Sequence, residues 1–303
     1  MTELLFTTRD VADMLQVDKS TIKRWTDEGK LKCFRTPGGH RKFRAEDLSQ
    51  FMADYNYNIS AANFLPVAAS DEAILRGMIV QKEFNVLDSV CFSTAIKGNK
   101  NDLLKLFSEA YKNGMSLPLM FDKILRPTVQ KISTLNTSGK LLLSEKQLAL
   151  NSLSNAIVLL SDIIVKPALN GKIVICAMVE NDSDDLELKA LAVLLESGGF
   201  EVLNLGVGTS ADSIAQLVKN KQPHFVFLMA SNVHDEELLE DEHEKIQSEL
   251  QSYGGKLIVS GPAYTQELLT GRLAGLFYKF CPTFKELTMV QYERIELKKK
   301  EKE

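Results

Sequence analysis

The spacing of apolar residues divides the chain into three stretches with different periods. Up to about residue 52, short amphipathic helical patterns stand beside one alternating, strand-like stretch. From 71 to 166 the apolar residues recur at i, i+3 and i+4, the spacing of amphipathic helices. From 171 onward, continuous apolar runs alternate with helical patterns. These periods predict three modules in chain order.

The third stretch predicts a doubly wound parallel sheet of the Rossmann or flavodoxin-like kind, because buried strands and helices alternate along it. Ligands of such sheets bind beyond the carboxyl ends of the strands, so the loop after the first strand is a candidate site. The predicted strands span 172–179, 200–206, 224–230, 256–261 and 275–279, and the predicted helices span 185–197, 211–220, 236–253, 266–274 and a closing segment from about 284.

The middle stretch predicts an antiparallel four-helix bundle, because four amphipathic runs follow one another with short connections. Residues 53–70 precede the bundle, mix small and polar residues around Pro66, and have no sustained period, which is typical of a linker. The four runs span 72–96, 102–114, 117–135 and 144–164.

The first stretch predicts a helix-turn-helix. Thr7 and Thr8 can cap a first helix, and a second helix begins after Asp18 and ends at Gly29, with Ile22 and Trp25 facing inward. The second helix of such a pair enters the major groove of DNA. Its outward candidates for DNA contact are Ser20, Thr21, Lys23 and Arg24.

A hairpin is predicted after this helix pair, because the turn residues Pro37-Gly38-Gly39 separate two strand-like segments, and a helix follows at 45–52. The hairpin would be a wing that faces phosphates, whereas the recognition helix would supply sequence choice. The wing candidates are Arg35, His40, Arg41 and Lys42.

Charge supports a nucleic-acid partner for the first module only. Nine basic and two acidic residues lie between Lys19 and Arg44, a local net charge of +7, so the rest of a chain with net charge -4 sums to -11. The four cysteines are far apart, so neither a zinc site nor a disulfide framework is predicted. No apolar run is long enough to span a membrane and no signal peptide opens the chain, so we expect a soluble, cytoplasmic protein.

The segment "TTRDVADMLQVDKSTIKRWTDEGKLKCFRTPGGHRKF" resembles the DNA-binding domain of MerR-family and excisionase-type regulators. The elements Thr-Ile-x-Arg-Trp and Gly-Gly-His-Arg-x-Phe are fairly specific to that family. The resemblance implies a winged helix-turn-helix over residues 1–52, operator DNA as the partner, and RNA polymerase as a further one.

With the bundle at 71–168 and the sheet at 169–292, nearly the whole chain resembles the cobalamin-dependent regulators that respond to light. In that family, a Glu-x-His-x-x-Gly motif after the first strand supplies the histidine that coordinates cobalt. Counting back from Gly199 and Gly206, the motif falls on Asp182 to Glu187, so that Asp184 replaces the histidine and Glu187 replaces the glycine.

Other positions of the family's cofactor site have also changed. The residues that cover the upper face of the corrin fall on Asn136, Lys146 and Gln147. The serine that accommodates the nucleotide tail falls on Met229, with Ser231 two places on, and a Gly-Gly pair falls on Ser260-Gly261. We therefore expect no cobalamin cofactor of the family's kind.

The acidic segment "VENDSDDLELKAL" at 179–191 allows several interpretations. Four interpretations are open: an altered cofactor site, a phosphate-accepting site, a site for Mg²⁺ or Ca²⁺, and a helix start. In the last, Asp182, Asp184 and Asp185 cap the helix and interact with the positive end of its dipole. The helix start is the favoured interpretation, and we expect neither a catalytic residue nor a bound metal.

The sequence thus predicts a MerR-type transcriptional regulator and not an enzyme. Its C-terminal half is expected to oligomerise, to respond to another small ligand or to bind a partner protein. The alternatives are a cobalamin photoreceptor with altered ligation, a corrinoid methyltransferase and a protein-interaction adaptor. Residues 293–303 read as a charged, solvated tail.

Overall fold

The computed structural model describes residues 5–15, 17–55, 72–233 and 235–290. The chain divides into two compact units, 1–160 and 161–303, and each is described by itself. The predicted tail at 293–303 and most of the predicted linker, 56–70, lie outside the described residues. Where the linker was predicted to begin, at residue 53, the preceding helix instead continues to Asp54.

The N-terminal part of the first unit, residues 5–55, is called the head. It contains three helices, α1 (Thr8–Leu15), α2 (Lys19–Asp27) and α3 (Ala45–Asp54), and a three-stranded antiparallel sheet. The strands β1 (Leu5–Thr7), β2 (Phe34–Arg35) and β3 (Arg41–Arg44) pair in the order β1-β3-β2. The helix-turn-helix and the hairpin are as predicted. Strand β1 was not predicted, because three residues are too few to show a period.

Local side-chain signals explain the ends of these elements. At the start of α1, the Thr7 hydroxyl accepts the Asp10 N–H at 3.2 Å and the Asp10 carboxylate accepts the Thr7 N–H at 2.7 Å, a reciprocal cap. Helix α2 stops at Gly29, whose φ of 71° favours glycine. The hairpin turns at Gly39, with φ of 79°, and the Thr36 N–H binds the His40 carbonyl at 2.9 Å.

The middle of the chain is helical, but the first predicted helix is two. Helix α4 (Glu72–Gln81) ends where Lys82 adopts a φ of 56°, and α5 (Phe84–Ile96) starts after it. The prediction of a single helix at 72–96 was wrong, because neither Gly nor Pro marks the break. The remaining segments are α6 (Lys100–Lys112), α7 (Leu117–Met120), η1 (Phe121–Leu125), α8 (Arg126–Thr137) and α9 (Leu143–Ser161).

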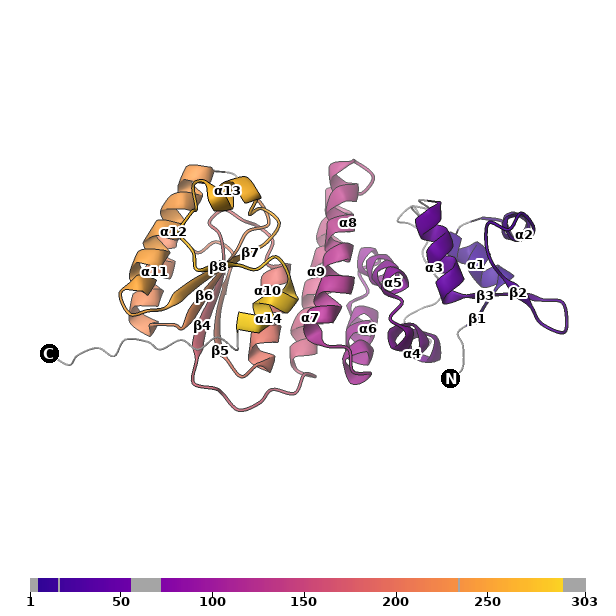
Figure 1. Ribbon diagram of the computed structural model, residues 1–303, viewed down its shortest axis with the longest axis horizontal. Coiled ribbons are helices and arrows are strands. Elements are labelled where there is room, and N and C mark those ends of the chain that lie inside the picture. Colours follow the sequence, from indigo (N-terminus) through magenta and orange to yellow (C-terminus); the bar gives the residue numbers. More distant parts are fainter. Residues whose placement is uncertain (1–4, 16, 56–71, 234, 291–303) are drawn as a thin grey trace. The chain divides into compact units, whose positions relative to one another are not determined.

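The second unit contains a five-stranded parallel sheet in the order β5-β4-β6-β7-β8. Helices α10 and α14 lie on one face of this sheet, and α11 and α12 lie on the other (Figure 1). The strands are β4 (Ile173–Met178), β5 (Glu201–Gly206), β6 (Phe225–Met229), β7 (Lys256–Ser260) and β8 (Lys279–Phe280). The helices are α10 (Leu186–Ser197), α11 (Ala211–Lys221), α12 (Glu236–Gln251), α13 (Gln266–Thr270) and α14 (Phe284–Met289).

This order makes the unit a doubly wound, flavodoxin-like fold, as predicted. The strand order reverses between β4 and β6, because β5 is added on one side of β4 and the later strands on the other, so the crevice beyond the carboxyl ends of β4 and β6 is the switch point of the parallel sheet. The last strand was predicted at 275–279 but lies at Lys279–Phe280, because the apolar stretch before it forms a turn. Within the described residues, no helix is long and apolar enough to cross a membrane.

Candidate functional site

Helix α2 presents the predicted contact residues on one side and packs the other side into the head. Ile22 is fully buried, whereas Ser20 and Lys23 are exposed and Thr21 is half-buried. The Arg24 side chain is 65% exposed and lies 4.0 Å from the Glu28 carboxylate. The polar side of α2 is therefore exposed to solvent, and contact of these residues with DNA stays a prediction.

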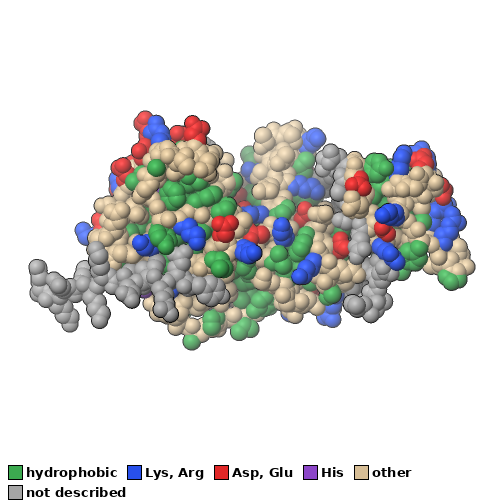
Figure 2. Space-filling view, viewed as in Figure 1, with side chains coloured by type: hydrophobic (Ala, Val, Ile, Leu, Met, Phe, Trp, Pro, Cys, Tyr) green, Lys and Arg blue, Asp and Glu red, His purple; other side chains and the backbone are tan. Residues whose placement is uncertain are grey.

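The hairpin adds further positive charge, and basic side chains gather over the head in Figure 2. His40 is exposed, and the Arg35 side chain is 59% exposed. Arg35 and Arg41 are cross-strand partners. Arg41 differs from the other wing candidates, because its side chain is only 14% exposed and its Nη2 lies 2.5 Å from Asp27 Oδ1.

Lys42 lies on the other face of the hairpin. Successive residues of a strand point to opposite faces, so Lys42 faces away from Arg41 and from the buried Phe43. Lys42 pairs with Phe34 and Thr7 and is half-buried. The four predicted wing residues therefore do not form a single surface.

The acidic segment lies at the switch point of the second unit, where Asp182 spans the crevice. Its carboxylate Oδ2 accepts the N–H of Ser231 at 2.6 Å and of Asn232 at 3.2 Å, both in the loop after β6. Its Oδ1 accepts the N–H of Ser183 at 2.8 Å and of Asp184 at 3.3 Å. Asp182 is only 5% exposed. Through these hydrogen bonds its side chain connects the loop after β4 to the loop after β6.

The neighbouring carboxylates bind N–H groups at helix starts. Asp184 Oδ1 accepts the N–H of Leu186, the first residue of α10, at 3.1 Å. Glu180 Oε2 accepts the N–H of Ala211, the first residue of α11, at 3.3 Å. These contacts agree with the helix-start interpretation for Asp184. The interpretation was wrong for Asp182, which binds the loop after β6, and for Asp185, whose side chain makes no cap hydrogen bond and lies 2.8 Å from Lys189 Nζ. Glu187 is half-buried in the first turn of α10.

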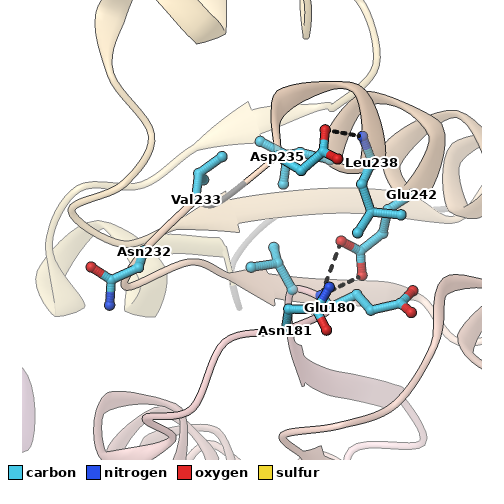
Figure 3. Close-up of a pocket in the computed structure, with 9 residues that line it drawn as sticks. Glu180, Asn181, Asn232, Val233, Asp235, Leu238 and Glu242 are labelled. Carbon is cyan, nitrogen blue, oxygen red and sulfur yellow. Dashed lines mark hydrogen bonds between the residues drawn. The ribbon is translucent and has the colours of Figure 1, made fainter.

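Glu242 on α12 is a site residue that the sequence reading missed. It is 1% exposed and lines a cavity of about 20 Å³, room for about one water molecule, with Glu180, Asn181 and Asn232 (Figure 3). Both carboxylate oxygens lie 3.3 Å from the Glu180 N–H. Burial raises the pKa of Glu242 to about 7. The sequence held a signal for this buried carboxyl, because Glu242 occupies a position in the apolar stripe of α12.

His243 is a core residue. Its Nδ1 lies 2.7 Å from the Leu239 carbonyl, and its Nε2 lies 3.1 Å from the Tyr264 hydroxyl. The ring is fully buried, and burial lowers the pKa of His243 to about 4. With both nitrogens engaged, the neutral ring is a structural part of α12. Within the described residues, no group of His, Cys, Asp and Glu could hold a metal ion.

The other positions that the family resemblance assigned to a cofactor site lie at strand ends of the second unit. Met229 is 2% exposed at the end of β6, and Ser231 gives its N–H to Asp182. Ser260 is 1% exposed at the end of β7. Gly261 has a φ of 117°, and a Cβ there would lie 2.2 Å from the Ala230 carbonyl oxygen, so only glycine fits.

The positions in the helical middle are also accounted for locally. Asn136 Nδ2 donates to the Leu141 carbonyl at 3.0 Å and closes the turn between α8 and α9. Lys146 is half-buried and Gln147 is exposed, both in the first two turns of α9.

Comparisons with known proteins agree with this architecture. Residues 5–55 match the helix-turn-helix domain family. The chain is 29% identical over 114 residues to the transcriptional repressor DcmR of Methylorubrum extorquens, a match over 37% of this chain and 42% of that repressor. The chain thus spans less than half the length of the curated relative it matches.

Among solved structures, the fold is similar to that of a monomethylamine corrinoid protein from Methanosarcina barkeri. The TM-score is 0.55 at 17% identity, over 66% of this chain and 94% of that one. A five-stranded sheet like that of cobalamin-binding domains therefore follows a helical middle and a helix-turn-helix head.

Replacing Asp182 with Ala is expected to lower the free energy of unfolding by about 2–4 kcal/mol, because four backbone N–H groups lose the charged acceptor that the buried Asp182 carboxylate provides. Asp184→Ala, which removes the acceptor of the Leu186 N–H, is the control and is expected to cost about 1 kcal/mol. Urea unfolding followed by circular dichroism measures both. Equal losses for the two variants would contradict the bridging role of Asp182.

Glu242 is expected to make stability depend on pH. Its pKa rises from 4.5 to about 7 on folding, so its contribution is fully present below pH 4.5 and is lost as pH rises through 7. Glu242→Gln removes this loss, so the variant should gain on the wild type by about 3 kcal/mol at most between pH 5 and pH 8.

The exposed Glu244→Gln on the same helix is the matched control and is expected to follow the wild type. Urea unfolding at both pH values gives the comparison. If Glu242→Gln and the wild type lost stability in parallel, the buried carboxyl would not be the group responsible.

Proposed function

We propose that this protein is a sequence-specific, DNA-binding transcriptional regulator of the MerR type, and not an enzyme. The observation that carries the proposal is the polar side of α2, with Lys23 and Arg24 exposed, beside a hairpin that carries Arg35 and His40. A recognition helix reads base edges with its N-terminal residues, while a basic wing holds phosphates.

The match to a helix-turn-helix family over residues 5–55 supports this proposal, as does the similarity to a protein named as a transcriptional repressor. The charge distribution gives independent support. Nine of the basic residues lie between Lys19 and Arg44 in a chain whose net charge is -4, so a polyanion would be attracted to the head in particular.

The second unit is proposed not to bind cobalamin. The residues at its switch point could not hold the corrin as the residues of the light-responsive family do. The position of the cobalt-ligating histidine is held by Asp184, an oxygen donor that already accepts the Leu186 N–H. Asp182 takes up the N–H groups of Ser231 and Asn232 in the crevice itself. No step of the proposed function depends on a bound corrin.

Self-association is part of the proposed function. One head offers a short recognition helix and a single wing, and helix-turn-helix proteins commonly gain affinity by reading two half-sites as dimers. The helical middle and the parallel sheet are proposed to supply that association, or to answer a different ligand or partner protein.

Arg24→Ala is expected to weaken DNA binding about tenfold, because an exposed guanidinium on the recognition helix contacts a base edge or phosphate. The measurement is a mobility-shift titration on duplexes that the wild-type protein enriches from a random-sequence pool. The matched control is Lys219→Ala, which removes one exposed positive charge from α11 of the other unit and should leave affinity unchanged. Equal affinities of the two variants would refute the assigned surface.

A further inference from the structure

Asp27 is a carboxylate within a cationic surface, in a place that two electrostatic effects disfavour. It is the last residue of α2, where the negative end of the helix dipole repels an anion. It also lies inside the block of basic residues that carries the proposed DNA contacts, where it would repel phosphates. A compensating contact is therefore expected.

The compensating contact is with both strands of the hairpin. Asp27 Oδ1 lies 2.5 Å from Arg41 Nη2 in β3 and 3.9 Å from Arg35 Nη2 in β2. Arg35 and Arg41 are cross-strand partners, so one oxygen holds the pair at the position where the hairpin begins to turn. The Arg41 side chain is 14% exposed and that of Asp27 is 61% exposed, so the guanidinium end of this ion pair is largely shielded from water.

The contact joins the two elements of the proposed DNA surface. Arg24 lies one turn before Asp27 on α2 and faces solvent. His40, at the end of the wing loop, is the residue directly before Arg41. The Asp27–Arg41 ion pair therefore links the segment that carries Arg24 to the segment that carries His40.

We propose that Asp27 is a positioning residue for DNA binding, which sets the wing against the recognition helix through Arg41. The proposal rests on the proposed DNA-binding function and deepens it. A wing held at a fixed angle meets its phosphates without a further loss of conformational freedom, whereas a released wing must be ordered on binding. In this role, the main contact of Arg41 is the ion pair with Asp27, and any contact of Arg41 with phosphate is secondary.

The direction in which one substitution changes the Kd distinguishes this positioning role from an effect of charge alone. Asp27→Asn removes a negative charge from the head and frees a guanidinium, so long-range attraction alone predicts tighter binding and a steeper dependence on salt. A positioning role predicts weaker binding despite the gain in positive charge. The two explanations thus predict opposite changes in Kd.

The matched control is Glu28→Gln, which removes the same charge at the next position. The ion-pair partners of Glu28 are Lys30 at 2.7 Å and Arg24 at 4.0 Å, in the loop after α2 and in α2 itself. The Kd of each full-length variant is measured on duplexes enriched by the wild-type protein, at several salt concentrations. We expect Asp27→Asn to weaken binding about tenfold and Glu28→Gln to bind as tightly as the wild type or more tightly.

Asp27→Glu provides the rescue and guards against a folding defect. It keeps the carboxylate and is expected to bind within about threefold of the wild type. Hydroxyl-radical footprints should show that Asp27→Asn shortens the protected stretch, while Asp27→Glu restores it. Tighter binding by Asp27→Asn, or a Glu variant as weak as the Asn variant, would overturn the positioning role. Failure of the wild type to enrich any duplex would instead refute the proposed function.

Discussion

The hydrogen bonds of Asp182 across the switch point are the contacts on which the second unit depends. A doubly wound sheet leaves N–H groups of its loops at this crevice, and a ligand commonly satisfies them. Here the Asp182 carboxylate binds the N–H groups of Ser231 and Asn232, so the two central loops are joined by the protein's own side chain. Glu180 and Glu242 extend the same junction to α11 and α12.

The head depends on the opposite use of charge. Most of its basic residues are exposed, and Asp27 lies against the guanidinium groups of Arg35 and Arg41 in the hairpin. Carboxylates thus have one physical role in both units, because each collects N–H donors from segments far apart in the sequence. In the second unit they join loops across a crevice, and in the head we propose that Asp27 sets the wing against the recognition helix of a DNA-binding surface.

Features specified by local sequence were predictable, and features specified by distant partners were not. The turn at Pro37 to Gly39 and the alternation of strands and helices follow from residues within a few positions of each other. The break at Lys82 carries no Gly or Pro, so the pattern continued through it. The placement of Asp184 could be predicted from its helix, whereas the reach of Asp182 to Ser231 required the fold. The ion pair of Arg41 could not be predicted, because its partner Asp27 lies fourteen residues earlier in the chain. The sequence therefore assigned Arg41 to phosphate contact alone.

We propose that the second unit has the fold of a cobalamin-binding domain but does not bind cobalamin. Equilibrium dialysis of the full-length protein in the dark against hydroxo-, methyl- and adenosylcobalamin, read by visible absorbance, tests it most directly. We expect equal cobalamin concentrations on both sides of the dialysis membrane. Retention of any of the three at about one equivalent per chain would contradict it.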